Sequence, residues 1–405
     1  METAPAVAPQ APLRLLRVAE AVARLGSAAR AAEELHLSVS AVSRAVVQAE
    51  TVFGQALFER AARGMHATLA GTVVASRARR ALAQLRQGGG PALALRATDA
   101  MLRALVAVAD SRSEAVAAAR LGLSQPAVHQ ALKQLEHAAR QRLLERSRRG
   151  TRLTEAGERA LHAVRLALAE LRTGHDELAA LSGASGGSVA LGALPMTADV
   201  LVPQALSRLF AARPGVMVTV ADGTYEALLL QLRHGELDFV VGPLRGTDAP
   251  PDIVEHEFFV DRLVPVVRAG HPLMAALHGG GRRRGRALRE LLRWPWIGPL
   301  PGTPARSAFE RAFSDAGLAV PRVDLQANSP PVVRSVLMGS DHVAMVSMLQ
   351  IRAEVASGLL AVVPVAVSGT ERSIGAMLRR DTQLSAVADA ALAALRDTAL
   401  AVAQS

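Results

Sequence analysis

The chain contains no cysteine, which excludes disulfide bonds, thiolate nucleophiles and cysteine-ligated zinc. Aromatic residues make up only 3% of it, so a surface that stacks sugars or single-stranded bases is not expected. The chain also lacks an uninterrupted apolar run of about 18 residues, and residues 1–12 lack the basic start and apolar stretch of a signal peptide. These absences favour a soluble, cytoplasmic protein that makes no membrane contact.

Sequence motifs of catalysis and of metal binding are missing as well. No Gly-x-Ser-x-Gly elbow joins a predicted strand to a predicted helix, and no His-Glu-x-x-His motif occurs. The 11 histidines are scattered, and the Gly-rich stretch 279–285 lacks the Gly-Lys-Ser/Thr of a phosphate loop. We therefore predict a protein that is not an enzyme and that uses no cofactor or metal.

The length of 405 residues is typical of two or three domains, and the net charge of +10 is unevenly divided among them. Residues 1–186 hold 25 Lys+Arg against 16 Asp+Glu, whereas the remainder holds 21 against 20. The first half is therefore the part suited to a polyanion, although a solvated basic surface would give the same count.

One module occurs twice in this basic half. A shift of 86 residues superimposes Ser38–Glu50 on Ser124–Glu136, and about 26 of the 57 positions between Leu15 and Gly71 are identical under that shift. We conclude that the module has been duplicated.

Apolar periodicity and turn residues predict the structure of the first module. Helices are expected over residues 13–24, 28–35 and 38–52, followed by a strand at 57–60, a turn at Arg63-Gly64, a returning strand at 67–69 and a long helix from Gly71. Two short helices joined by a tight turn, followed by a hairpin, indicate a winged helix-turn-helix, for which a plain three-helix bundle is the alternative.

Several short motifs at fixed spacing decide between these alternatives. They are Gly26-Ser27, Ala31-Ala32, Leu35-His36-Leu37-Ser38, Ala41-Val42-Ser43, Leu57-Phe58-Glu59-Arg60 and Thr68 to Gly71. In this combination they resemble the DNA-binding head of LysR-type transcriptional regulators. The resemblance implies that the long helix after each head is a linker helix through which subunits dimerise.

The second module repeats this pattern, with the Ala-rich helix at 114–121, the third helix from Gln125 and a long helix over 157–181. We predict a first winged helix-turn-helix with its helix at 12–87, a flexible linker at 88–97 that includes three glycines and Pro91, and a second winged helix-turn-helix with its linker helix at 98–181. The resemblance places a homo-oligomer interface, for a dimer or tetramer, on the 157–181 helix.

Both copies depart from the family pattern. Val39-Ser40 stands where Gln-Pro or Gln-Ser is usual, and Ala49 where leucine is usual. In the second copy His129 replaces a serine, and Ala139-Arg140 replaces a Leu-Gly pair.

The duplication allows the faces of the third helix to be compared within one chain. The inward positions keep their character, whereas the outward stripe changes from Ser40, Ser43, Arg44 and Val47 to Pro126, His129, Gln130 and Lys133. Because Arg and Gln prefer different base edges, two heads that both bind should read different sequences. The alternative is drift in a copy that no longer reads DNA.

The predicted contacts with double-stranded DNA are the outward residues of the third helices and the arginines of the wings. They are Ser38, Ser40, Ser43, Arg44, Arg60 and Arg63 in the first head, and Ser124, Gln125, Pro126, His129, Gln130, Lys133, Arg146 and Arg149 in the second.

After a Ser/Gly-rich stretch at 182–188, short apolar runs alternate with helical patterns, as in a parallel α/β sheet. Pro214-Gly-Val, Leu232 to Asp238 and Gly270-His-Pro-Leu273 resemble the periplasmic-binding-protein-like effector domain of LysR-type regulators. The predicted fold is thus multidomain: two winged helix-turn-helix domains rich in α-helix, then a two-lobed α/β effector domain at 188–400. We expect lobe I to comprise 188–242 and 328–400, and lobe II to comprise 243–327.

Small-molecule effectors of such folds bind at the carboxyl ends of strands, where helix N-termini offer N–H groups. The loops in that position predict that Thr197, Thr224, Thr303, Arg306 and Ser329 contact an effector of unknown identity, although Thr or Ser at a helix start is often only a cap.

The sequence therefore predicts a sequence-specific transcriptional regulator modulated by a small molecule. The alternative is a ligand-binding interaction protein in which one or both heads serve dimerisation. Salt-dependent binding to promoter DNA would separate the two.

Overall fold

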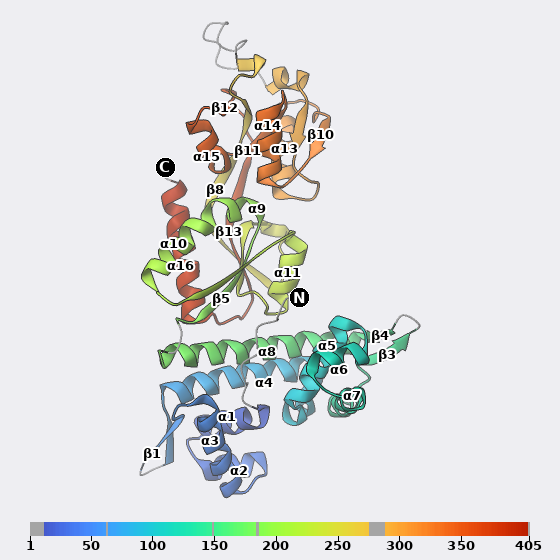
Figure 1. Ribbon diagram of the computed structural model, residues 1–405, viewed down its shortest axis with the longest axis vertical. Coiled ribbons are helices and arrows are strands. Elements are labelled where there is room, and N and C mark those ends of the chain that lie inside the picture. Colours follow the sequence, from blue (N-terminus) through green and yellow to red (C-terminus); the bar gives the residue numbers. More distant parts are fainter. Residues whose placement is uncertain (1–11, 62–63, 148–149, 184–185, 275–287, 404–405) are drawn as a thin grey trace. The chain divides into compact units, whose positions relative to one another are not determined.

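The computed structural model describes residues 12–61, 64–147, 150–183, 186–274 and 288–403. It divides into two compact units, with the main boundary along the chain between Gly187 and Ser188, and with Arg233–Glu236 grouped with the first unit. The first unit contains both copies of the module, which we call the first and second heads, and the second unit is the α/β effector domain (Figure 1).

The two heads have the same succession of elements. The first comprises α1 (Leu13–Leu25), α2 (Ala28–Leu35), α3 (Val39–Phe53), a hairpin of β1 (Phe58–Ala61) and β2 (Gly64–Ala67), and the long helix α4 (Leu69–Arg96). The second comprises α5 (Asp99–Ser111), α6 (Glu114–Leu121), α7 (Gln125–Ala139), a hairpin of β3 (Leu144–Ser147) and β4 (Gly150–Leu153), and α8 (Glu155–Leu181). The winged helix-turn-helix is therefore present twice.

The same side chains hold both folds together. The carboxylate of Glu50 accepts the N–H groups of Leu57 and Phe58 at 2.9 and 3.2 Å, and Glu136 accepts those of Leu143 and Leu144 at 2.8 and 3.1 Å. Each carboxylate thereby fixes the chain where it leaves the third helix and enters the wing.

The start of each long helix is also built alike. Thr68 and Thr154 cap α4 and α8 by accepting the N–H groups of Gly71 and Gly157, both at 3.0 Å. A Cβ on Gly71 would lie 1.9 Å from the Leu57 carbonyl oxygen, and one on Gly157 would lie 2.0 Å from that of Leu143. Only glycine allows the helix to pass so close to the wing.

The segment 88–97, predicted to be a flexible linker, is instead part of the fold. Helix α4 runs through it and bends at Gly90, whose φ of 81° breaks the helical geometry just before Pro91. Leu93 is fully buried, and Arg17 of α1 donates hydrogen bonds to the carbonyls of Ala94 and Ala97, both at 2.7 Å. The glycines that suggested flexibility provide the bend and a close helix contact described below.

In the effector domain, the strands run in the order β10-β9-β11-β8-β13-β7-β5-β6, with β12 also paired to β8. They are β5 (Ser188–Ala193), β6 (Met217–Asp222), β7 (Phe239–Pro243), β8 (Ile253–Arg268), β9 (Trp296–Gly298), β10 (Val323–Gln326), β11 (Val343–Ser347), β12 (Leu360–Val362) and β13 (Glu371–Arg379). The helices are α9 (Pro195–Asp199), α10 (Leu201–Ala212), α11 (Tyr225–Arg233), α13 (Pro304–Asp315), α14 (Pro330–Gly339), α15 (Met348–Ala356) and α16 (Ala386–Ala403), with 3₁₀ turns at Gly246–Asp248 and Leu288–Arg293.

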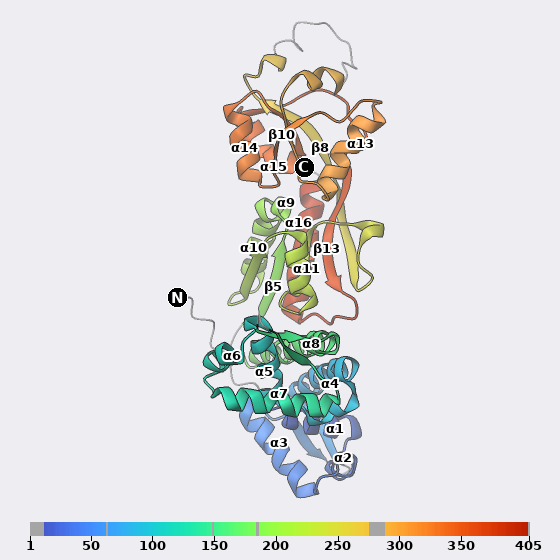
Figure 2. The same cartoon turned by 90° about the vertical axis from the view of Figure 1, so that its right-hand side faces the viewer.

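The domain has two lobes, each with helices on both faces of its part of the sheet (Figures 1 and 2). In lobe I, α10 and α16 share one apolar core with β5, β7 and β13, and α11 covers the other face. In lobe II, α13 lies over one core and α14 and α15 over another.

The lobe boundaries differ from the predicted ones. The first half of β8 pairs with β13 in lobe I and its second half pairs with β11 and β12 in lobe II, so the chain crosses within β8 and not at residue 243. Residues 328–363, predicted for lobe I, supply α14, β11, α15 and β12 to lobe II. The assignment was wrong because alternating apolar runs do not specify the sheet that a strand joins.

Candidate DNA-binding and effector sites

Helix α3 presents a polar stripe opposite its buried face. Val42, Val46 and Ala49 are buried in the head, and Ser40, Arg44 and Val47 are exposed. Ser43 is half-buried. The exposed Ser38 caps the helix by accepting the N–H of Ala41 at 3.1 Å, and its hydroxyl lies 3.0 Å from that of Ser40. The predicted stripe is thus on the surface, with Ser43 at its edge.

Helix α7 has the same buried face and a different exposed one. Val128, Leu132 and Leu135 are buried, and the residues predicted to contact DNA from this helix and its cap, apart from His129, are exposed: Ser124, Gln125, Pro126, Gln130 and Lys133. Pro126 occupies the first turn, where its missing N–H removes no helical hydrogen bond.

His129 has a contact that the sequence did not reveal. Its Nδ1 lies 3.1 Å from a carboxylate oxygen of Glu114, the first residue of α6, and its ring is half-buried. The corresponding residues of the first head are Ser43 and Ala28, which cannot form this pair. The signal in the sequence is that both positions of the pair differ between the copies under the 86-residue shift.

The wing arginines are only partly described. Arg60 pairs with Met65 in the first hairpin and Arg146 with Thr151 in the second. Arg63 and Arg149 lie outside the described residues.

The predicted effector-binding hydroxyls have structural roles. Thr197 is fully buried, and its hydroxyl donates toward the carbonyls of Leu194 and Val241 at 2.9 and 2.8 Å. Thr224 accepts the N–H of Ala227 at 3.3 Å, and Thr303 accepts that of Arg306 at 3.1 Å. These contacts are helix caps or turn bonds, so each hydroxyl has only part of its hydrogen-bonding capacity left for a ligand.

Ser329 precedes α14 without a side-chain cap hydrogen bond. Its neighbour Asn328 accepts the N–H of Leu300 at 3.0 Å. The loops that follow β9 and β10 are thereby joined at the carboxyl ends of these strands, where ligands of open α/β sheets bind.

Two arginines at this edge have unsatisfied nitrogens. Arg306 of α13 donates from Nε to Glu310 at 2.6 Å, and its buried Nη1 has no partner among the described residues. Arg245, which no sequence motif indicated, donates from Nη1 to the Gly302 carbonyl at 2.7 Å, and its buried Nε is likewise without a partner among those residues. Both arginines therefore border the same loop after β9.

A further ion pair joins the lobes. Arg334 of α14 donates to Asp199 of α9 at 2.5 Å and also lies 3.3 Å from Glu354. A buried pair marks the crossing strands, where Asp261 accepts from Arg372 at 2.9 Å and from Ser347 at 2.6 Å. The Arg334–Asp199 pair and the hydrogen bonds of Asp261 therefore link the lobes at two places.

Two winged helix-turn-helix heads followed by a two-lobed α/β domain define a ligand-responsive DNA-binding regulator. The model of the LysR substrate binding domain matches residues 182–400, and the model of the bacterial regulatory helix-turn-helix protein of the lysR family matches twice, at residues 13–72 and 100–158. The chain belongs to the LysR family of transcriptional regulators, which bind DNA through the helix-turn-helix and an effector through the substrate-binding domain.

Two curated relatives cover different shares of this chain. The HTH-type transcriptional regulator GalR of Pseudomonas putida is 36% identical over 386 residues, which are 93% of this chain and 94% of GalR. The uncovered 7% is shorter than either matched head, so this similarity includes at least part of each head. PcaQ of Agrobacterium fabrum is 30% identical over 299 residues, which are 94% of PcaQ and 74% of this chain.

Solved structures share the fold. ArgP from Mycobacterium tuberculosis has a TM-score of 0.57 at 19% identity and covers 74% of this chain and 96% of its own. CbnR in complex with its target DNA has a TM-score of 0.51 at 20% identity over 74% of this chain and 98% of its own. Among the described residues, no helix is both long and apolar enough to cross a membrane.

Proposed function

We propose that this regulator reads duplex DNA with both of its heads, acts in the cytoplasm and has no enzymatic activity of its own. The observation that supports two readers is the exposed stripe of each third helix. Both stripes carry long polar side chains suited to base edges, Arg44 in one and Gln130 with Lys133 in the other, on scaffolds that are equally well capped and packed.

Salt titration of DNA binding tests this proposal. The full chain is titrated onto a pool of random-sequence duplexes between 50 and 200 mM salt, and the affinity is expected to fall steeply, because each neutralised phosphate releases counterions. Wild-type chain is compared with a variant in which Arg44 and Gln130 are both alanine. Absence of binding, or binding that salt does not weaken, would support heads that serve only dimerisation.

We propose that the effector binds between the lobes beside Arg306 and carries an anionic group. The unpartnered, buried Nη1 of Arg306 and Nε of Arg245 support this charge, since a guanidinium nitrogen without an acceptor is costly to bury. Thr224, Thr303 and Ser329 remain predicted contacts at the rim, as does Thr197, although its hydroxyl is already used.

Thermal-shift screening with small carboxylic acids, sugars and neutral aromatics tests the effector proposal. A ligand at about 100 times its Kd should stabilise the domain by about 2.7 kcal/mol. Arg306→Gln should abolish the shift by an acid, whereas the matched control Arg322→Gln, whose side chain is 93% exposed, should keep it. Shifts produced by sugars alone, and unchanged in Arg306→Gln, would contradict an anionic effector.

The prediction of a dimer or tetramer formed through the 157–181 helix stays a prediction. The apolar stripe that suggested it includes Leu161, Val164 and Leu171, which belong to the core that the two heads share within one chain. Contacts between whole chains would then need another surface, or a partner in place of α4.

A further inference from the structure

We propose that the two heads of one chain pair with each other through α4 and α8, so that a single chain presents both recognition helices of a DNA-reading pair whose half-sites differ. This inference rests on the proposed DNA binding, but the pairing can be tested without DNA. A chain with one head would need a second chain to bring two heads together. Here the duplicated module supplies both.

The packing of α4 against α8 is the first support. One apolar core contains buried residues of both heads and of both long helices, from Leu13 to Leu178. The buried faces of the two helices coincide under the 86-residue shift: Val74, Ala78, Ala81 and Leu85 of α4 correspond to Ala160, Val164, Ala167 and Leu171 of α8. The equivalent face of each long helix is therefore the face that packs against the other long helix.

The contacts are reciprocal, as in a two-fold symmetric dimer. A Cβ built on Gly88 of α4 would lie 2.2 Å from the Cβ of Ala163 in α8, and one built on Gly174 of α8 would lie 3.1 Å from the Cβ of Arg77 in α4. Gly174 is the counterpart of Gly88, and Ala163 that of Arg77. Such exchanged contacts are those of an isologous interface, in which an approximate two-fold axis relates α4 to α8.

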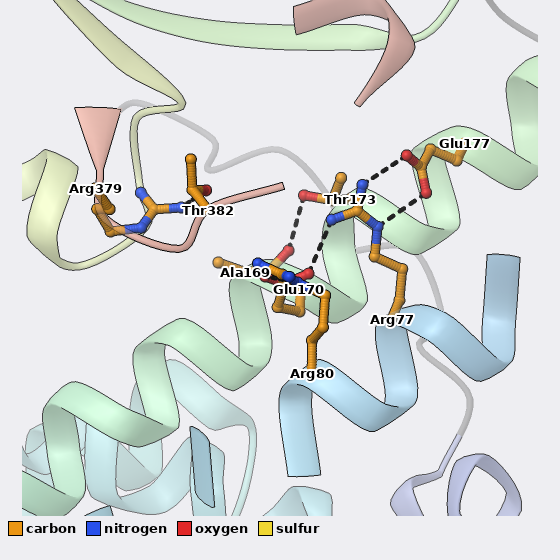
Figure 3. A network of polar contacts seen from close by, with 8 residues as sticks. All are labelled: Arg77, Arg80, Ala169, Glu170, Thr173, Glu177, Arg379 and Thr382. Carbon is orange, nitrogen blue, oxygen red and sulfur yellow. Dashed lines mark hydrogen bonds and ion pairs between the residues drawn. The ribbon is translucent and has the colours of Figure 1, made fainter. Parts of the chain in front are cut away.

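The charges of this interface break the symmetry (Figure 3). Arg77 of α4 donates from Nη1 to Glu170 at 2.9 Å and from Nη2 to Glu177 at 2.6 Å, and Arg80 donates to Glu170 at 3.0 Å. Arg77 and Glu170 are both buried. Burial alone would lower the pKa of Arg77, but the hydrogen bonds to Glu177 and Glu170 and the charges of these two residues together outweigh burial and raise that pKa.

The positions that correspond to these charged residues under the 86-residue shift are uncharged. The counterparts of Arg77, Arg80, Glu170 and Glu177 are Ala163, Leu166, Gln84 and Pro91. If α8 paired with α8 of a second chain in this geometry, Glu170 would face Ala163 and Leu166 with no cation. If α4 paired with α4, Arg77 would lack a carboxylate. Since unpaired buried charges are strongly destabilising, the two helices have become complementary to each other and unsuited to themselves.

A disulfide tests the pairing directly, because the chain has no cysteine of its own. In the full-length variant Arg77→Cys with Gly174→Cys, the Cβ positions would be 3.1 Å apart, so α4 and α8 need to separate by only about 0.5 Å to reach the roughly 3.5–4.5 Å of a disulfide. We expect oxidation to close a loop within one chain, seen as the mass of a single chain under denaturing, non-reducing conditions. A disulfide between two chains, or none in a variant that is folded by circular dichroism, would overturn the pairing.

The same variant separates this inference from the proposed function. The oxidised chain should bind the random duplex pool as tightly as the reduced chain, since the disulfide fixes the pair that reads DNA. If wild type binds and oxidation abolishes binding, the inference fails and the proposed function stands. If wild type binds no duplex, the proposed function fails and the disulfide still reports on the pairing.

If the cysteine variant does not fold, exchanging the charges of one ion pair provides a second test of the pairing. Arg77→Glu should lower the melting temperature, and adding Glu177→Arg should restore part of the loss by re-forming one pair with the opposite polarity, while Glu170 stays beside the new carboxylate. Equal melting temperatures for the single and double variants would overturn the complementarity.

Discussion

The two heads differ in the exposed stripes of α3 and α7 and share the side-chain contacts that stabilise each head. Their carboxylate locks, Glu50 and Glu136, make the same two hydrogen bonds with distances that differ by about 0.1 Å. Arg44 of the first stripe and Gln130 of the second, in contrast, share no base preference. The comparison shows that the exposed stripe can change between the heads while the scaffold stays the same.

The largest expected effect comes from the glycines that the heads share. Gly71→Ala and Gly157→Ala should each destabilise the chain by about 3 kcal/mol, because the new Cβ would meet a backbone oxygen that cannot move aside. Urea unfolding measures both. Gly339→Ala, with nothing within 4 Å of the new Cβ, is the matched control. A large loss in one head only would show that the scaffolds are not equivalent.

The carboxylate locks should give the next largest effect. Glu50→Gln and Glu136→Gln should each cost about 2 kcal/mol, since hydrogen bonds to a charged acceptor are stronger than those to an amide. Glu155→Gln is a control on a carboxylate that is 89% exposed. Unequal costs at Glu50 and Glu136, again by urea unfolding, would break the comparison.

Substitutions in the exposed stripes of α3 and α7 should affect DNA binding and leave stability unchanged, unlike substitutions in the scaffold. Arg44→Ala and Gln130→Ala should leave stability unchanged, and each should weaken DNA binding by about 1–3 kcal/mol through a different half-site. Footprinting of each variant on a DNA fragment bound by wild type shows which half-site is lost. Loss of one and the same half-site in both variants would contradict two readers.

The smallest effect concerns His129. Glu114→Ala removes the acceptor 3.1 Å from its ring and should change the affinity by about 1 kcal/mol or less, while shifting the base preference of the second half-site only. Selection of bound sequences by the variant and by wild type measures this shift. An unchanged preference would show that His129 does not touch bases.

Much of this architecture could be predicted from the sequence. The caps and the turn residues identified both heads, and the 86-residue shift identified the unequal stripes. The pairing of α4 with α8 could not be predicted, because an apolar stripe such as Leu161, Val164 and Leu171 does not specify whether its partner is in the same chain. Gly88 suggested a flexible linker because flexible segments are rich in glycine. In the structure the missing side chain of Gly88 instead allows α4 to pack closely against α8.

In the effector domain, helices and strands were predicted better than their grouping. Residues 328–363 were assigned to the wrong lobe because strand pairing is non-local. Thr197, Thr224 and Thr303 were selected as polar residues at helix starts, and the structure gives all three hydrogen bonds within the domain. Arg245 was missed because only its approach to Gly302 across the lobes makes it notable.

The most direct measurement is the DNA site that wild-type chain selects from a pool of random duplexes. If the heads of one chain read as a pair, the selected site has two unlike half-sites at a fixed spacing, and Arg44→Ala and Gln130→Ala each relax a different half. A selected site that is a perfect palindrome, with both halves relaxed by Arg44→Ala and neither by Gln130→Ala, would contradict the account.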